Sequence, residues 1–254
     1  TLNCNYNIIN MEEVFVCSAV MAATTITEKE ISIIIRSDIM EPKMFCFQCQ
    51  ETAGNKGCMF GGVCGKKPET ANLQDLLIYV TKGLSEITTR LRSEGKEIPA
   101  AIDRLITTNL FMTITNANFD DDRFIDRINA TLSSRDELFE QLHDDTGLSD
   151  AASWQYRTAE ERTLKADKVG VLDTRNEDLL SLRELTLYGL KGMAAYNKHA
   201  NVLGYADTAI DAFLQKALAK TLDDSLSTDD LTSLVLETGS FGVKVMALLD
   251  TANT

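Results

Sequence analysis

Residues 44–67, MFCFQCQETAGNKGCMFGGVCGKK, lead directly into residues 68–95, PETANLQDLLIYVTKGLSEITTRLRSEG. The first of these segments is a cysteine-rich loop. Its cysteines follow the spacing C-x2-C-x8-C-x5-C and are Cys46, Cys49, Cys58 and Cys64. The five glycines between residues 54 and 65 favour positive-φ turns and close backbone approach, which let amide N–H groups point toward sulfur. Four thiolates bunched this tightly indicate one metal centre that the loop wraps.

Three kinds of site compete for these cysteines. Disulfides suit a small secreted scaffold, but this chain has 254 residues and only six cysteines, so its context is unlike that of a disulfide framework. Zinc suits four thiolates in a tetrahedron, although zinc sites usually pair two short knuckles and here only Cys46 and Cys49 are closely spaced. An iron–sulfur cluster fits the spacing as well. The spacing leaves zinc and iron–sulfur both open.

The second quoted segment predicts a long helix. Pro68 suits the first helical turn and Gly95 marks the end. Between them, apolar residues recur at steps of three and four: Leu73, Leu76, Leu77, Val80, Leu84, Ile87 and Leu91. This helix begins directly after the cysteine loop.

Further helices are expected along the rest of the chain. Two lie at residues 100–114 and from the acidic cap at 120–122 to Leu142, and the others at 176–198, 206–221, 228–238 and 241–252. Ser227 and Asp230 form a candidate capping box. No alternating β pattern is evident after residue 44, and only three prolines are present. The expected fold class is mainly α, with two three-helix bundles behind an N-terminal cysteine-rich cluster-binding loop.

These elements predict five segments. Residues 1–43 read as a non-native or disordered leader, in which Cys4 and Cys17 need no function. The cluster loop covers 44–66, the first bundle 67–143, an irregular connection 144–176 and the second bundle 177–254. Short connections between helices favour antiparallel neighbours within each bundle.

Composition narrows the function classes. A net charge of −13 argues against nucleic-acid binding, because phosphate neutralisation needs clustered Lys and Arg. No stretch reads as apolar enough over the length that a bilayer requires. The content of 44% hydrophobic and 25% charged residues is that of an ordinary globular protein. We therefore expect no nucleic acid and no membrane among the partners, and a cytoplasmic location.

The cysteine loop and three later blocks resemble one known family. Residues 44–85, MFCFQCQETAGNKGCMFGGVCGKKPETANLQDLLIYVTKGLS, are similar to the amino terminus of the hybrid-cluster proteins, also called hydroxylamine reductases. The later blocks are NLFMTITNANFD at 109–120, LYGLKGMAAYNKHANVLG at 187–204 and GVKVMALLDTAN at 242–253. The resemblance therefore covers the whole chain beyond residue 43.

The resemblance implies a cofactor and a reaction. In that family the amino-terminal cysteines hold a conventional cluster, and the x2, x8, x5 spacing is similar to the [4Fe–4S] subgroup. Cys46, Cys49, Cys58 and Cys64 are carried over as its ligands. A soluble redox donor protein would supply electrons. A separate hybrid iron–sulfur–oxygen cluster reduces small nitrogen species, hydroxylamine to ammonia or nitric oxide to nitrous oxide. Amino-terminal helical bundles also belong to the family fold.

One departure from the family is plain. The hybrid-cluster ligands include one His, Glu residues and further Cys residues in later Rossmann-like domains, whereas this chain has no cysteine after Cys64. Its two histidines, His143 and His199, do not match the family's ligand position. The expected reading is an amino-terminal, electron-accepting fragment without catalytic residues of its own. The alternative is a zinc-stabilised helical interaction protein without redox activity.

Overall fold

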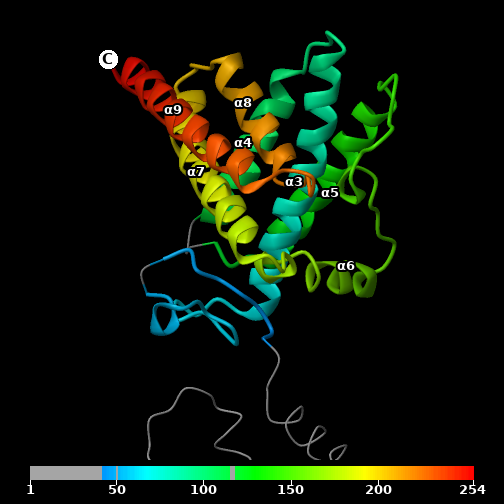
Figure 1. Ribbon diagram of the computed structural model, residues 1–254, viewed down its shortest axis with the longest axis vertical. Coiled ribbons are helices and arrows are strands. Elements are labelled where there is room, and N and C mark those ends of the chain that lie inside the picture. Colours follow the sequence, from blue (N-terminus) through cyan, green and yellow to red (C-terminus); the bar gives the residue numbers. More distant parts are fainter. Residues whose placement is uncertain (1–41, 50, 115–117) are drawn as a thin grey trace, which may run out of the picture. The chain divides into compact units, whose positions relative to one another are not determined.

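The computed structural model describes residues 42–49, 51–114 and 118–254. The predicted leader, with Cys4 and Cys17, lies outside the described residues except for Pro42 and Lys43. Within the described part, the elements are α-helices and short 3-10 turns, and the only β pairing is an isolated bridge. The prediction of a mainly α fold is confirmed (Figure 1).

Seven α-helices follow the cysteine loop in the described part of the chain. They are α3 (Pro68–Ser93), α4 (Ala100–Ile114), α5 (Asp121–Phe139), α6 (Ala159–Ala166), α7 (Glu177–Val202), α8 (Thr208–Lys220) and α9 (Thr228–Asn253). Three 3-10 turns accompany them: η1 (Ala53–Asn55), η2 (Asp150–Ala152) and η3 (Val171–Asp173). The predicted connection at 144–176 thus carries the short helix α6 and two of these turns.

Helix α3 has the bounds that its sequence predicts. Pro68 occupies the first turn, and Gly95 follows the C-cap with φ +79°, a conformation that glycine adopts without steric cost. Every apolar residue of the predicted face is buried. The helix starts one residue after the loop, so it fixes the loop to the helical body.

Local capping and glycine geometry also set the ends of three other helices. The Asp120 side chain accepts a hydrogen bond from the Arg123 N–H at 3.1 Å and begins α5. The capping box of Ser227 and Asp230 is present at α9. Helix α7 runs to Val202, beyond the expected end at 198, and stops before Gly204, which has φ +86°. Asp120 is therefore part of a helix N-terminus, as expected.

The predicted break between residues 238 and 241 is wrong. Gly239 and Gly242 punctuate the sequence, but neither has a positive φ, and α9 is one continuous helix of 26 residues. Packing on α7 explains this continuity, because a Cβ on Gly189 of α7 would lie 2.8 Å from Cγ2 of Thr238. Close contact along α7 outweighs the weak helix propensity of the glycines.

The continuity of α9 also bears on the expectation that no stretch of the chain is apolar enough over the length that a bilayer requires. Among the described helices, only α9 is long and apolar enough to cross a membrane by length and composition. Core helices of globular proteins pass the same test, and α9 contributes Leu231, Leu234 and Val245 to the core. Its length is therefore weak evidence for a membrane span.

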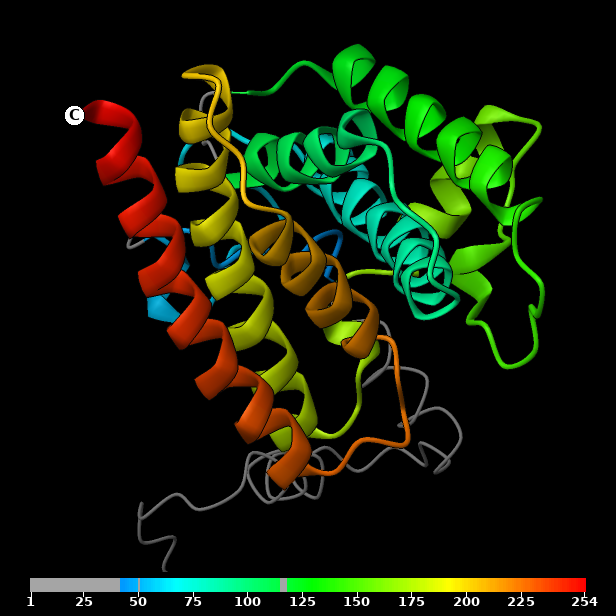
Figure 2. The same cartoon turned by 90° about the horizontal axis from the view of Figure 1, so that it is seen from above.

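Helix α3 lies between two hydrophobic cores. One face of α3 packs on α4 and α8, in a core to which α7 and α9 also contribute, and the other face packs with α5 and α6 (Figure 2). Buried amides link the helices across these cores. Asn109 on α4 donates to Thr81 on α3 at 3.0 Å and to Thr131 on α5 at 2.8 Å. The larger core includes residues from helices on both sides of the 144–176 connection, so the packing does not divide there.

Candidate metal centre

The cysteine loop folds back on itself so that the backbones of two of its cysteines are hydrogen-bonded to each other. Cys46 and Cys58 form an antiparallel bridge, with N–H···O distances of 3.0 Å and 2.8 Å. Cys58 is buried and Cys46 is half-buried. The eight-residue spacing between Cys49 and Cys58 is the length of chain that makes this return through η1.

Glycine permits the tight turns of the loop. Positive φ occurs at three of the five loop glycines, and Gly57 has the largest value, +117°. A Cβ on Gly57 would lie 2.5 Å from Cε2 of Phe45, and one on Gly62 would lie 3.1 Å from Sγ of Cys64. Larger side chains at these positions would displace the aromatic ring or the sulfur. The expected role of glycine is therefore confirmed for close approach to a cysteine sulfur at Gly62.

Polar groups gather around the two paired cysteines. The Thr52 hydroxyl donates to the Cys46 carbonyl at 3.2 Å and lies 3.8 Å from Sγ of Cys58. Burial raises the pKa of the Cys58 thiol. Hydrogen bonds with the backbone at Ala53 and Val63, aided by Thr52, outweigh this effect and hold the pKa below its usual value. A depressed pKa favours the thiolate, the form that binds a metal.

The loop supplies the donor atoms of a thiolate site. None of its four cysteines is in a disulfide; Cys49 is half-buried, and Cys64 is exposed. Within the described residues, no three Cys, His, Asp or Glu side chains converge closely enough to hold one metal ion. The bridge brings Cys46 and Cys58 together, and the other two thiols lie in the same loop. The donor set fits thiolate-loving metals, iron or zinc, by its chemistry.

Aromatic residues fasten the loop to α7. The Phe45 and Phe47 rings lie 5.8 Å apart, and Phe47 stacks on Tyr188 of α7 at 6.5 Å. The Tyr188 hydroxyl donates to the Gln48 carbonyl at 3.3 Å. Phe60, by contrast, is 46% exposed.

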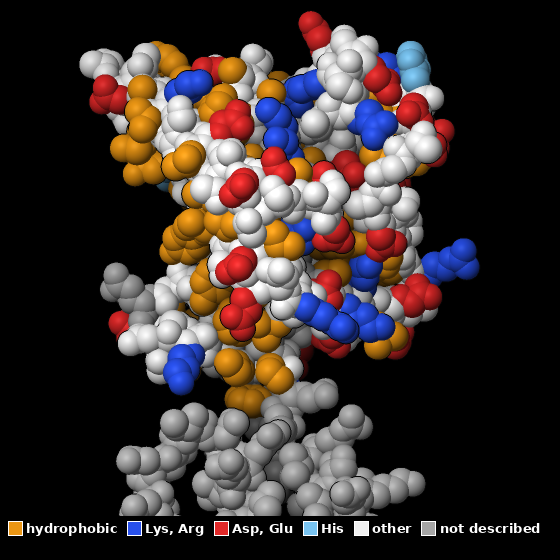
Figure 3. Space-filling view, viewed as in Figure 1, with side chains coloured by type: hydrophobic (Ala, Val, Ile, Leu, Met, Phe, Trp, Pro, Cys, Tyr) orange, Lys and Arg blue, Asp and Glu red, His pale blue; other side chains and the backbone are white. Residues whose placement is uncertain are grey.

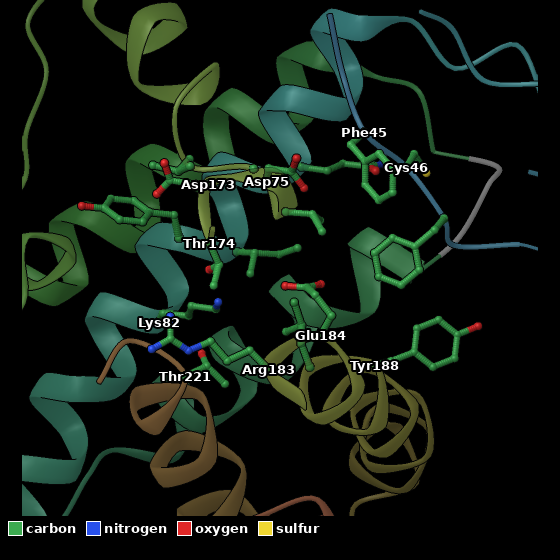
Figure 4. A pocket seen from close by; sticks show the side chains of 18 of the residues that line it. Phe45, Cys46, Asp75, Lys82, Asp173, Thr174, Arg183, Glu184, Tyr188 and Thr221 are labelled. Atoms are coloured by element: carbon green, nitrogen blue, oxygen red, sulfur yellow. The ribbon is translucent and has the colours of Figure 1, made fainter. Parts of the chain in front are cut away.

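A cavity of about 210 Å³ opens beside Cys46, between α3, α7 and the η3 segment. Figure 4 shows Asp75 on the side of Phe45 and Cys46, Glu184 nearer the centre, and Lys82 with Arg183 on the other side. Burial raises the pKa of Asp75 to about 7 and lowers the pKa of Lys191 to about 8. The sequence reading missed this cavity; charged residues spaced seven apart on α3, Asp75 and Lys82, were the available signal.

The histidines lie away from the loop's chemistry. Both are exposed, and His199 packs edge-on against Phe111 at 5.9 Å between ring centroids. His143 donates its backbone N–H to Glu94. These contacts are structural.

Comparison with known proteins identifies the family of this chain. Residues 44–254 match the model of the Prismane/CO dehydrogenase family. The chain is 61% identical over 215 residues to a hydroxylamine reductase of Desulfovibrio desulfuricans, covering 85% of this chain and 39% of the relative. It is 52% identical over 217 residues to that of Clostridium perfringens, covering 83% and 39%. The chain thus spans about two fifths of the length of these relatives.

Proposed function

Because this chain belongs to the Prismane/CO dehydrogenase family, we propose that its cysteine loop holds a [4Fe–4S] cluster and accepts electrons for a hydroxylamine reductase. Cys46, Cys49, Cys58 and Cys64 are the ligands in this proposal. The observation that carries it is the loop itself, which presents four thiols without a disulfide and pairs the backbones of Cys46 and Cys58. The resident cluster would supply one-electron transfer.

The residues around the loop divide it into a covered side and an open side. Phe45 and Phe47 pack on the side of α7 and limit water there. On the other side Cys64 is exposed, and Phe60 and Val63 beside it are 46% and 61% exposed. We assign the docking of a soluble redox donor protein to this open side, since short distance and exposed apolar contacts favour transient electron-transfer complexes.

The whole enzyme would use these electrons on a small nitrogen compound. Hydroxylamine takes up two electrons and two protons to give ammonia and water, and two molecules of nitric oxide take up the same number to give nitrous oxide and water. This reduction would occur at the hybrid cluster of the longer protein. The present chain has no cysteine after Cys64, so we expect the 254 residues alone to be redox-active and not to turn over hydroxylamine. The proposed location is the cytoplasm.

A turnover assay with a redox titration tests this proposal. The chain, purified anaerobically with its cluster, should show a reversible one-electron signal and no saturable ammonia production from hydroxylamine. The Cys58→Ser variant should lack the signal. Saturable ammonia production by the 254-residue chain would contradict the assignment of the reaction to a second centre, and the absence of any redox signal would contradict the cluster.

An exposed apolar row supports a second candidate function, a zinc-stabilised interaction protein. Leu236, Val243 and Met246 of α9 are each more than half exposed. Figure 3 shows apolar side chains along the edge of the molecule where α9 and α7 lie. Exposed apolar patches often mark interaction sites. A colourless protein with one zinc per chain and no sulfide would favour this function over electron transfer.

A further inference from the structure

Lys66 is a buried lysine that points at a cysteine sulfur. The residue is 2% exposed, and its Nζ lies 3.6 Å from Sγ of Cys46. The same ammonium donates to Oε1 of Gln74 on α3 at 2.7 Å. Gln74 is itself 3% exposed. The ammonium is therefore held between the cysteine loop and α3.

The fold builds this contact from residues twenty positions apart. The Gly62 N–H donates to the Lys66 carbonyl at 2.8 Å and closes the turn around Cys64. This turn leads directly to Pro68, where α3 starts. Lys66 is thus placed by the last loop turn on one side and by the first turns of α3 on the other, so its position is rigidly set.

The ammonium lacks an ordinary counter-ion. In the part of the chain that the structure describes, Lys66 takes part in no salt bridge within 4.0 Å. A buried cation is costly unless an anion or strong acceptors offset it. Gln74 is neutral, and Asp75 on α3 makes no salt bridge with Lys66, so among the described residues the closest group able to carry a negative charge is the Cys46 sulfur, 3.6 Å from Nζ. The burial of Lys66 is therefore explained if the cysteine site next to it carries negative charge in the folded protein.

We propose that Lys66 is a positioning residue for electron transfer, whose buried ammonium raises the reduction potential of the cluster held by Cys46. This inference rests on the proposed function. An external one-electron reductant would supply one electron, which would add one negative charge beside Cys46, and no bond would form or break. A fixed positive charge beside a ligand sulfur stabilises that added charge, and the low-dielectric surroundings of Lys66 leave the interaction poorly screened.

The neighbouring lysine provides a matched control. Lys67 is exposed and lies at the N-cap of α3 without a side-chain contact to the loop sulfurs. Water and salt screen an exposed charge much more than a buried one. Replacing either lysine with methionine removes one positive charge from the chain, so only the location of the charge differs between the two variants.

The test is a mediated redox titration of the anaerobically purified 254-residue chain, with iron and sulfide measured on each sample. Lys66→Met should shift the midpoint potential to a more negative value, whereas Lys66→Arg and Lys67→Met should stay close to wild type. Gln74→Glu should also lower the potential, because a carboxylate at this position would neutralise the ammonium. Gln74→Glu keeps Lys66 in place, so this variant tests the effect of the Lys66 charge on the midpoint potential if Lys66→Met fails to retain its cluster.

The outcomes separate this inference from the proposed function. A wild-type chain that holds zinc and no sulfide overturns both. A wild-type chain with a full cluster, and Lys66→Met and Gln74→Glu variants with wild-type potentials, overturns only the role of Lys66. A negative shift in the Lys66→Met or Gln74→Glu variant, absent from Lys67→Met, supports it.

Discussion

Replacing Gly83 with alanine should destabilise the fold severely. Gly83 lies in α3 where the helix meets η2, and a Cβ there would be 1.9 Å from the carbonyl oxygen of Ala151 and 2.4 Å from its carbon. Such a contact forces the η2 backbone to withdraw by at least about 1 Å. The same carbonyl accepts a hydrogen bond from Arg135, whose side chain is fully buried, at 3.0 Å. Withdrawal of η2 would weaken this bond.

The magnitude follows from three contributions. Alanine gains about 0.5–1 kcal/mol over glycine in a helix. Overpacking costs about 1–3 kcal/mol, and loss of a buried hydrogen bond to a charged group costs about 1.5–3 kcal/mol. We expect a net loss of about 1.5–5.5 kcal/mol in the free energy of unfolding, which corresponds to a fall in Tm of roughly 3–22 °C for a chain of this size.

Gly192→Ala provides the matched control, since Gly192 lies inside α7 and a Cβ added there would have no neighbouring atom within 4 Å. This variant should be as stable as wild type or more stable by up to about 1 kcal/mol. Both variants are measured by urea unfolding followed by circular dichroism at equal cluster content. Stabilities of Gly83→Ala and Gly192→Ala within about 0.5 kcal/mol of each other would refute the reasoning.

Three further predictions concern the loop, a buried carboxylate and the exposed row of α9. Ser variants of Cys46, Cys49, Cys58 or Cys64 should lose or convert the cluster, because alkoxide replaces thiolate poorly at iron; iron analysis checks this, and equal iron loss in Cys4→Ser or Cys17→Ser would contradict it. Burial raises the pKa of Asp211 from 3.8 to about 6. The stability that the neutral Asp211 carboxyl contributes to the fold is therefore fully present below pH 3.8 and is lost as the pH rises through 6. Asp211→Asn should therefore gain about 2 kcal/mol over wild type above pH 6 and little near pH 4, by urea unfolding at both pH values; an equal gain at both would exclude the titration. Leu236→Lys, at a 71% exposed position, should change the free energy of unfolding by less than about 0.5 kcal/mol. Leu234→Lys, at a 2% exposed position, should cost more than about 3 kcal/mol. Equal losses in the two variants would show that the outer face of α9 is covered.

Sequence reasoning succeeded where local chemistry decides the structure. Pro68 and Gly95 bound α3, and Asp120 begins α5, because proline geometry, positive φ and side-chain capping act within a few residues. It failed at Gly239, because the neighbouring Thr238 packs closely on Gly189 of α7 and the helix continues past the glycine. That contact joins residues about fifty positions apart and leaves no mark in the local pattern.

The candidate site shows the same division. The four closely spaced cysteines predict a metal centre, because metal binding depends on residue type and short intervals, and that centre stays a prediction. Lys66 and Lys67 are equivalent in the sequence, and only the packing of the loop on α3 buries one of them. The sequence pattern did not predict the role of Asn197 either. In the structure Asn197 donates to Asp211 at 2.8 Å and to Thr107 at 3.1 Å, and so joins three helices.

The most direct measurement of the central claim is the iron, acid-labile sulfide and zinc content of the anaerobically purified chain. Our account predicts a brown protein with about four iron and about four sulfide per chain, and loss of both in the Cys58→Ser variant. A colourless protein with about one zinc per chain and no sulfide would contradict the account.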